Sequence, residues 1–174
     1  MAAFRVVVVT DGGARLAERV RALLAVGVEV LVREPTLPED VPWKAVIAHA
    51  RMPGALAVAH QLHLPATGDL AATKAIFRGP IGQSCHDVHE VARAREFGAA
   101  YTVLSPAFAP RHGRPARGLD GAAGSLVLGG VTHENVSMCR RAGAVGVLVM
   151  GAVWHAADPL RAAEALLKAA TRPA

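Results

Sequence analysis

Four histidines lie where acid–base chemistry could occur. His49, His63 and His86 each lie at or near the end of a short apolar run, and His112 lies on the long loop 107–118. An imidazole exchanges a proton near neutral pH, so each of them is a candidate general acid or base. A hydrogen-bonded structural histidine is the alternative in each case, and the sequence leaves both interpretations open.

Arg33 and Glu34 end another apolar run, which covers residues 28–34. Charged side chains at such a position are costly unless they are paired or face a wet pocket. Two interpretations stay open. Either the two residues form an internal ion pair at the mouth of the fold, or Arg33 binds an anion and Glu34 acts as a carboxylate base.

Glycines end the last two apolar runs, with Gly129 and Gly130 in the first and Gly151 in the second. Glycines allow backbone N–H groups to approach a phosphate, and helices that begin near Thr132 and Asp158 would add their positive dipole ends. The alternative is that the glycines only permit tight turns. Their place in the series of runs predicts a phosphate site.

The longest loop concentrates positive charge, because Arg111, Arg114 and Arg117 surround His112 and Asp120 is the one acid nearby. Such a patch suits a flexible flap that gathers a phosphate or a carboxylate. A solvated, arginine-rich loop is the alternative interpretation of the same residues.

Eight short apolar runs must position these residues. They are apolar over consecutive residues rather than alternating, which is typical of strands buried on both faces of a parallel sheet. Most gaps between them have helical periodicity, with Asp87 and Asp158 as predicted N-caps. The predicted strands cover residues 5–11, 28–34, 44–50, 62–65, 80–86, 99–106, 125–131 and 146–152, and the predicted helices cover 14–26, 53–61, 70–77, 87–97, 132–142 and 157–170.

Eight strands alternating with helices predict a compact (β/α)8 TIM barrel that occupies residues 1–174 as a single domain. A doubly wound open sheet is the alternative. The crossovers at 35–42 and 120–124 are too short for a full helix. They leave part of the barrel wall uncovered, where a second subunit of a homo-oligomer could bind. Ligands of such barrels bind at the carboxyl ends of the strands, which include Ser105.

The composition argues against several classes of protein. The net charge of +5 comes mostly from scattered arginines without interleaved aromatic residues, which argues against a nucleic-acid partner. No secretory signal and no apolar run of membrane-spanning length is evident, so we expect a cytoplasmic protein without a membrane partner. Cys85 and Cys139 are predicted to be small buried hydrophobes, and the histidine spacing does not indicate a zinc site.

The residues resemble the thiamine-phosphate synthase superfamily, and within it the TenI-like thiazole tautomerases. Each matching motif is weak alone, but the motifs occur in order over nearly the whole chain. They are VVVTD at 7–11, LVRE at 31–34, HL at 63–64, GQSCH at 82–86, YTVLSPAFAP at 101–110, PARGLD at 115–120, LGGVTHENV at 128–136 and VLVMGAVW at 147–154.

The resemblance implies a barrel that binds a small phosphorylated thiazole. Its phosphate would lie at the ends of the last two strands, and a second anionic group of the ligand would meet Arg33 or the loop arginines, with Ser105 also in the site. No metal and no cofactor is implied. The phosphate-binding residues carried over from the family are Gly129, Gly130, Gly151 and Ala152.

Departures from the family pattern distinguish its members. The synthases carry Gln and Lys around the second-strand arginine, where this chain has Leu31 and Pro35. They also hold Mg²⁺ with an Asn–Asp pair after the third strand, where the matching residues are His49 and Ala50. Losing these groups argues against a reaction with a diphosphate leaving group.

The resemblance therefore favours an isomerase of thiamine biosynthesis, a thiazole tautomerase that aromatises a carboxylated thiazole phosphate by moving a proton. In such tautomerases a histidine can follow the sixth strand as acid–base, and here Pro106 occupies that position. His112, His86 and Glu34 are the candidate catalytic residues in its place. A non-catalytic, regulatory paralogue that keeps the phosphate site and a thiamine-phosphate synthase are the alternatives.

Overall fold

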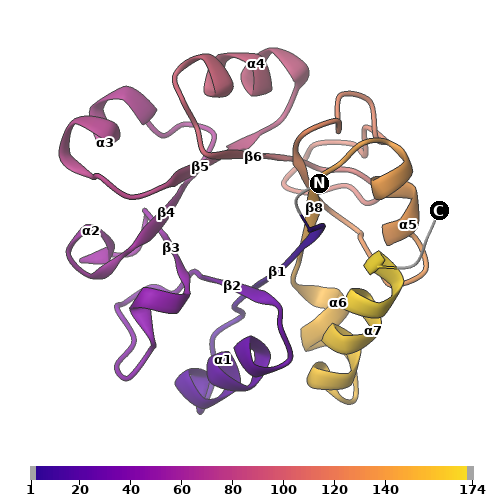
Figure 1. Cartoon of the computed structure of the whole chain (residues 1–174), viewed down its shortest axis with the longest axis horizontal. Helices are drawn as coiled ribbons and strands as arrows, with labels where there is room; N and C mark the ends of the chain where they lie inside the picture. The colour runs from indigo at the N-terminus through magenta and orange to yellow at the C-terminus, as the bar shows by residue number, and fades with distance from the viewer. Residues whose placement is uncertain (1–2, 172–174) are drawn as a thin grey trace.

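The computed structural model describes residues 3–171, which form a closed barrel of eight parallel strands (Figure 1). The strands are β1 Arg5–Val9, β2 Glu29–Val32, β3 Ile47–His49, β4 Gln61–Leu64, β5 Ile81–Cys85, β6 Tyr101–Leu104, β7 Leu126–Leu128 and β8 Gly146–Val149. They follow one another around the barrel in chain order, and β1 pairs with β8 to close it. The predicted TIM barrel is confirmed and the open sheet is wrong. The ends of the predicted 1–174 domain lie outside the described residues.

The consecutive apolar residues of the strands are buried on both sides, as predicted. In β1, Val7 and Val9 belong to the barrel interior, whereas Val6 and Val8 belong to the core between strands and helices. Because each strand supplies both layers, its residues must be apolar consecutively rather than alternately. The interior core consists of Val7, Val9, Leu31, Ile47, Tyr101, Val103, Leu126 and Leu148.

Helices surround the strands. Two predicted N-caps are confirmed, since Asp87 Oδ1 accepts the Glu90 N–H at 2.7 Å and Asp158 Oδ1 accepts the Arg161 N–H at 3.1 Å. Cys85 and Cys139 are both buried, as predicted, and neither forms a disulfide. The helices are α1 Leu16–Ala25, α2 Ala55–Val58, α3 Leu70–Ile76, α4 Val88–Glu96, α5 Val136–Arg141, α6 Gly151–Trp154 and α7 Pro159–Thr171.

The two predicted short crossovers lack a full helix. Only a 3₁₀ turn, η1 (Trp43–Ala45), lies between β2 and β3, and it replaces the start of the predicted strand 44–50. Within residues 3–171, no helix lies between β6 and β7.

Two elements near the end of the chain differ from the prediction. Helix α5 begins at Val136 rather than near 132, because Asn135 Oδ1 accepts the Thr132 N–H at 2.8 Å and holds these residues in a turn. The sequence does not predict α6, since its apolar residues simply continue the last strand pattern.

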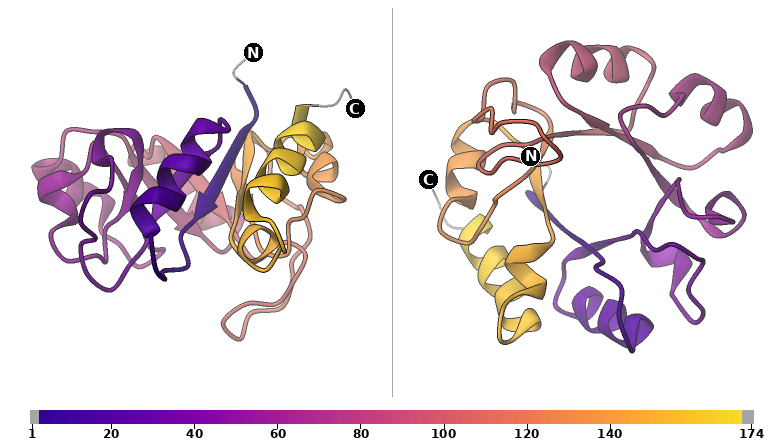
Figure 2. Two further views of the ribbon diagram at one scale, coloured as in Figure 1. Left: turned by 90° about the horizontal axis from the view of Figure 1, so that it is seen from below. Right: turned by 180° about the vertical axis from the view of Figure 1, so that it is seen from behind.

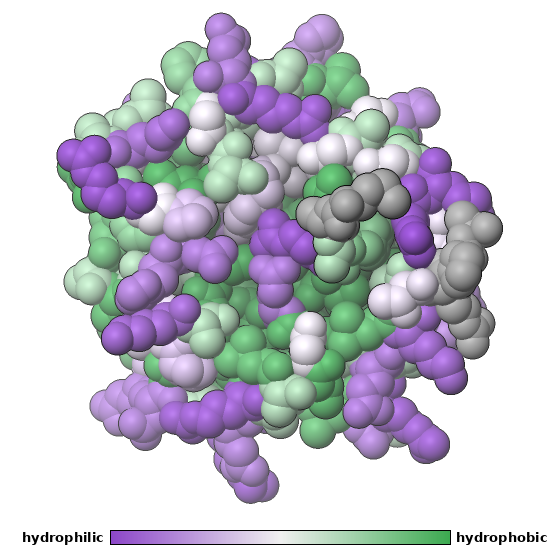
Figure 3. All heavy atoms as spheres, viewed as in Figure 1, coloured by the Kyte–Doolittle hydropathy of each residue, from purple (hydrophilic) through white to green (hydrophobic). Residues whose placement is uncertain are grey.

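The strands begin at one end of the barrel and terminate at the other. The chain enters β1 at one end, and the β6–β7 connection extends beyond the other end, where the strands terminate (Figure 2). Figure 3 shows the first of these ends, where hydrophobic residues surround the centre and hydrophilic ones project mainly around the rim. Arg5 and Glu29 form an ion pair of 2.6 Å there. None of the helices within residues 3–171 is long and apolar enough to cross a membrane.

Candidate functional site

A cavity of about 330 Å³, called here the strand-end cavity, opens at the carboxyl ends of β2 to β7. This is the end of the barrel at which the fold binds its ligands, and the β6–β7 connection contributes one wall. The lining residues are Arg33, His49, Arg51, Pro65, Ala66, Thr67, Ser84, His86, Ser105, Pro106, Arg111, His112, Arg114 and Leu128.

A second cavity of about 390 Å³ lies on the outside of the barrel, between α1 and the segment of α6 and α7. Residues such as Leu23 and Pro159 line it, and none of the predicted site residues does. Although it is larger, it is remote from the strand ends at which barrels perform chemistry. The strand-end cavity is therefore the candidate functional site.

Positive charge surrounds the strand-end cavity. Arg33, Arg51, Arg111 and Arg114 line it, and its lining residues, all within the described part of the chain, include no carboxylate. Burial lowers the pKa of Arg111, and the charge of Arg33 lowers it further, so these cations repel each other across the cavity. A bound anion would relieve this repulsion, so the cavity is suited to an anionic ligand.

His49 forms part of the cavity wall as a neutral ring. Its Nδ1 accepts the Arg51 N–H at 3.2 Å, which leaves the single proton of a neutral imidazole on Nε2. Burial, followed by the charges of Arg33 and Arg51, lowers the pKa of His49 to about 4. At neutral pH this histidine is therefore a hydrogen-bond donor rather than a cation.

Ser84 connects the cavity to the barrel interior. Its hydroxyl lies 2.8 Å from His63 Nε2, and His63 Nδ1 lies 3.2 Å from the Tyr101 hydroxyl. His63 is 3% exposed and Tyr101 is 8% exposed, so only Ser84 of the three lines the cavity. The sequence predicts His63 as an acid–base candidate, but the structure encloses it and presents Ser84 instead.

His86 lies at the cavity wall, and both its backbone N–H and its carbonyl oxygen are hydrogen-bonded to side chains. Its N–H donates to Glu90 Oε2 at 2.7 Å, and Arg117 Nη1 donates to its carbonyl oxygen. His86 Nδ1 lies 3.2 Å from the carbonyl oxygen of Ser105, which can only accept, so Nδ1 carries the proton. In the neutral ring Nε2 then has a free lone pair, which is what a general base requires.

The other predicted residues on this side are placed differently. His112 lines the cavity from the exposed loop, with φ at 49°, and Arg111 and Arg114 bridge across the turn that contains it. Ser105 also lines the cavity but is buried, with 5% of its surface exposed. The structure therefore brings His86, His112 and Ser105 to one cavity.

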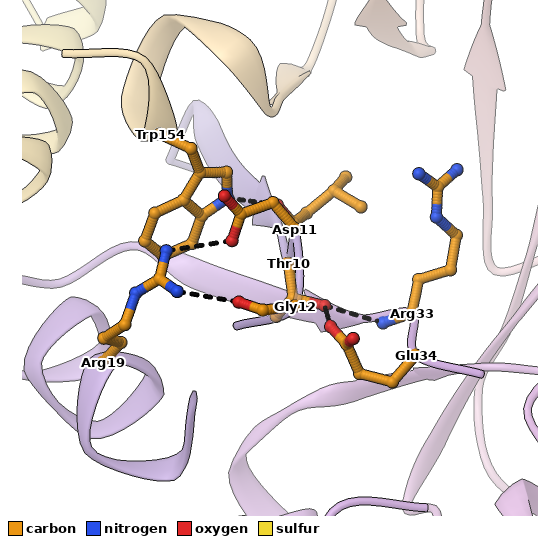
Figure 4. A network of polar contacts seen from close by, with 8 residues as sticks. Thr10, Asp11, Gly12, Arg19, Arg33, Glu34 and Trp154 are labelled. Carbon is orange, nitrogen blue, oxygen red and sulfur yellow. Dashed lines mark hydrogen bonds and ion pairs between the residues drawn. The ribbon is translucent and has the colours of Figure 1, made fainter. Parts of the chain in front are cut away.

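Arg33 and Glu34 point in different directions (Figure 4). Glu34 Oε1 accepts a hydrogen bond of 2.5 Å from the Thr10 hydroxyl, which in turn accepts the Arg33 N–H at 2.9 Å. The Arg33 side chain extends to Met150, with Nη2 3.6 Å from Sδ. Within residues 3–171 no ion pair joins Arg33 to Glu34, so the first of the two interpretations is wrong. Glu34 does not line the cavity.

Side chains of α1 and α6 hold the ends of β1 and β8 together (Figure 4). Trp154 Nε1 donates to the carbonyl oxygen of Val9 at 2.7 Å, and the Arg19 guanidinium lies 3.9 Å from the centroid of the Trp154 ring. Arg19 also donates to Asp11 Oδ1 at 2.9 Å. These contacts fix the turn after β8, which contains Gly151.

The predicted phosphate-binding glycines lie beside the strand-end cavity and do not line it. A methyl group on Gly129 would lie 2.9 Å from the Ala107 nitrogen, and one on Gly130 would lie 2.8 Å from the Ala109 methyl. Both residues have positive φ, 110° and 71°. Close packing of the β6–β7 connection therefore explains these glycines without a ligand.

The turns after β7 and β8 offer backbone donors. In the part of the chain that the structure describes, the N–H groups of Gly130, Gly151 and Ala152 donate to no backbone carbonyl. Gly151 and Ala152 begin α6 and are only half-buried. These groups are free to bind a phosphate oxygen next to the strand-end cavity.

Two arginines have roles that the sequence does not reveal. Arg51 lines the cavity from the turn two residues after the end of β3, and the sequence assigns it to no charged patch. Arg117, predicted to gather anions, instead donates to the carbonyl oxygen of His86 and does not line the cavity. Only the path of the chain after each strand decides which arginine reaches the cavity.

The neutral state of His49 predicts a pH-dependent stability. In the unfolded chain a histidine has an ordinary pKa of about 6.5, so as the pH falls from about 6.5 to 4 the unfolded state binds a proton that folded His49 does not. Stability is thus lost on acidification, by at most about 1.4 kcal/mol per pH unit. Urea unfolding at several pH values should show a slope that His49→Asn reduces by about 1 kcal/mol per pH unit.

The exposed His155 provides the matched control for this experiment. His155→Asn should keep the slope of the parent protein. Equal slopes for His49→Asn and the parent would show that His49 is not held neutral by the fold.

Comparison with known families identifies one match. The family model described as thiamine monophosphate synthase (TMP-TENI) matches residues 45–153. These residues include the whole run from β3 to the end of β8.

Curated relatives match over a shorter length. The thiamine-phosphate synthase of Salinispora tropica is 36% identical over 102 residues, which are 52% of this chain and 49% of the relative. That of Salinibacter ruber is 36% identical over 93 residues, 47% of this chain and 41% of the relative. The matched part of the chain thus spans about half the length of these relatives or less.

Solved structures match the entire barrel. Thiamine phosphate pyrophosphorylase from Pyrococcus furiosus superposes with a TM-score of 0.80 at 24% identity, covering 96% of this chain and 95% of that one. The 3-hexulose-6-phosphate synthase of Salmonella typhimurium superposes with a TM-score of 0.64 at 17% identity, covering 95% and 98%. A pyrophosphorylase and a hexulose phosphate synthase thus share this barrel. At such low sequence identities, structural similarity establishes the fold and not the function.

Proposed function

The chain belongs to the thiamine monophosphate synthase family, and on that premise we propose that it is an isomerase that moves a proton on a carboxylated thiazole phosphate. The observation that carries this proposal is the strand-end cavity, which four arginines and no carboxylate line. Such a lining suits a ligand with an anionic group in addition to its phosphate.

The lining does not fit the Mg²⁺ that the synthases use. Where they carry an Asn–Asp pair, this chain has His49, the last residue of β3, and Ala50. Within residues 3–171, no group of three or more His, Cys, Asp and Glu side chains could hold a metal ion. Mg²⁺ prefers oxygen ligands, above all carboxylates, and the lining of the strand-end cavity has no carboxylate.

The proposed reaction needs only a base, an acid and a fixed ligand. His86 Nε2 takes a proton from a saturated ring carbon, the electron pair forms a double bond within the ring while the double bond that leaves the ring is broken, and a proton is returned to the carbon outside the ring. Substrate and product thus have the same composition, and the ring becomes aromatic. His112 is the second acid–base candidate, because it lines the same cavity.

The phosphate of the proposed substrate binds at the turn after β8. The free N–H groups of Gly151 and Ala152, with that of Gly130, support this placement. Arg33 spans the distance between that turn and the strand-end cavity through its contact with Met150. The carboxylate would then lie among the cavity arginines, and Glu34 would keep its bond to Thr10 rather than act as the base.

Thiamine-phosphate synthase is the second candidate, and the names of the curated relatives favour it over the isomerase. The residues of the cavity favour the isomerase instead. An assay with the carboxylated thiazole phosphate, run with and without the pyrimidine diphosphate and Mg²⁺, separates the two. Isomerisation without the diphosphate supports the proposal. Product only when diphosphate and Mg²⁺ are both present contradicts it, and binding without turnover indicates a non-catalytic paralogue.

Replacing the proposed base tests the role of His86. His86→Asn should lower kcat for isomerisation about a hundredfold with little change in KM, because general base catalysis typically contributes at least this much. His60→Asn, on an exposed residue far from the cavity, should retain full activity. If His86→Asn and His60→Asn have equal kcat and His112→Asn does not, the base is His112.

A further inference from the structure

Three side chains form a hydrogen-bonded chain that runs from the barrel interior to the strand-end cavity. Tyr101 on β6 contacts His63 on β4, and His63 contacts Ser84 on β5, at 3.2 Å and 2.8 Å. The Tyr101 and His63 rings are stacked with centroids 5.7 Å apart. The sequence gives no reason to connect these residues, which lie on three different strands.

The two interior members of this chain are uncharged. Burial, followed by the neighbouring His49, lowers the pKa of His63 to about 3. Burial also raises the pKa of Tyr101 well above its usual value. Near neutral pH a neutral imidazole therefore faces a protonated phenol.

The direction of the hydrogen bonds follows from counting protons. Within residues 3–171 the Tyr101 hydroxyl has His63 Nδ1 as its one hydrogen-bond partner. A buried hydroxyl proton without an acceptor is costly, so the favoured arrangement has Tyr101 donating to Nδ1. A neutral imidazole that accepts at Nδ1 carries its proton at Nε2, and His63 Nε2 therefore donates to Ser84 Oγ. The hydroxyl proton of Ser84 is then available to the cavity. A chain of this kind also polarises its last member, which strengthens the donor.

We propose that Ser84 is a fixed hydrogen-bond donor to the carboxylate of the ligand, and that His63 and Tyr101 are positioning residues that set its direction. This inference rests on the proposed function for the identity of the ligand. Strand β5 lies across the barrel from the β8 turn, where the phosphate is proposed to bind. The group of the ligand that reaches Ser84 is therefore the end remote from the phosphate.

The direction of the chain determines which ligands are accepted. A buried donor without an acceptor leaves a polar group unpaired, so a ligand that lacks the acceptor is penalised. Ser84 should therefore discriminate between a carboxylated thiazole phosphate and the same compound without its carboxylate.

Nitrogen NMR of the unliganded protein tests the chain independently of any function. With ¹⁵N-labelled histidine and His63→Gln to assign the signal, His63 should be the neutral Nε2–H tautomer from pH 5 to 8. Tyr101→Phe, which removes only the donor to Nδ1, should abolish this strict preference. Finding the Nδ1–H tautomer or a charged imidazole in the parent protein overturns the proposal.

Calorimetry with the two thiazole phosphates tests the recognition. Ser84→Ala should weaken binding of the carboxylated compound about tenfold and should leave binding of the decarboxylated one equal or tighter, because the unpaired donor is gone, whereas Ser137→Ala on α5 should change neither. An equal change for both compounds overturns the assignment of Ser84 to the carboxylate. If the parent protein binds neither compound, the proposed function fails, and the NMR experiment still decides whether the donor chain exists.

Discussion

Replacing Arg33 and Arg111 together with glutamine is expected to weaken binding of an anionic thiazole phosphate about a thousandfold. Both guanidinium groups line the strand-end cavity, and no carboxylate among the lining residues competes for them. Hydrogen bonds to charged groups contribute roughly 1.5–3 kcal/mol each, and two of them lost amount to about 4 kcal/mol. Isothermal titration calorimetry of the parent and the variant measures this loss directly.

A second double variant controls for net charge. Arg141 and Arg161 are exposed on α5 and α7, and replacing both with glutamine removes the same charge without touching the cavity. This control should bind within about twofold of the parent. Equal weakening in both variants would mean that the protein attracts anions by its overall charge, and that the strand-end cavity is not the binding site. The Arg33 and Arg111 variant should also be more stable without ligand, because their mutual repulsion is removed.

Gly82→Ala is expected to destabilise the fold by about 3 kcal/mol or more. A methyl group at this position would overlap the ring of Tyr101, which is buried in the barrel interior. The ring has little freedom to move aside, because its hydroxyl bonds to His63 and the Arg5 guanidinium lies 4.7 Å from its centroid. Urea unfolding of the parent and the variant gives the difference in free energy.

Gly113→Ala is the matched control for this substitution. Gly113 has φ at 75° and no other atom lies within 4 Å of the position its methyl group would take, so only local backbone strain of about 1 kcal/mol is expected. Adding Tyr101→Leu to Gly82→Ala should cost less than the sum of the two single changes, because the smaller side chain relieves the overlap. Additive costs, or a Gly82→Ala variant as stable as Gly113→Ala, would contradict the steric explanation.

The motif GQSCH at 82–86 contains Gly82 and two residues of the strand-end cavity. Gly82 makes room for Tyr101, Ser84 receives the hydrogen bond from His63, and His86 lies at the cavity wall. Alternation along β5 directs these three residues toward the barrel axis. The motif thus combines one packing requirement with two polar groups of the cavity.

Much of the fold follows from local pattern. Consecutive apolar residues in runs such as 5–11 and 146–152 predict buried parallel strands, and a series of eight predicts a closed barrel. Caps such as Asp87 depend on residues three positions away and are predicted correctly. The errors occur at element boundaries, where 43–45 forms a turn and 151–154 a short helix, because apolar composition alone does not distinguish these from a strand.

The sequence predicts only some of the residues that line the strand-end cavity. Strand position places His86, Ser105 and Arg33 at the right end of the barrel, and the loop sequence places His112 there. Neither signal separates Arg33 from Glu34, which are adjacent in sequence and yet face a cavity and a threonine, respectively.

What the amino-acid pattern determined here is the barrel and the end of it that carries the chemistry, since both depend on burial and on residues close in sequence. What only the tertiary structure decided is which polar groups meet. Ser84, His63 and Tyr101 come from three strands, Arg51 from a tight turn, and Arg117 is diverted to a carbonyl oxygen. These contacts join residues up to 38 positions apart, so they depend on strand register and loop path. The packing of the whole barrel sets both, and no local preference encodes them.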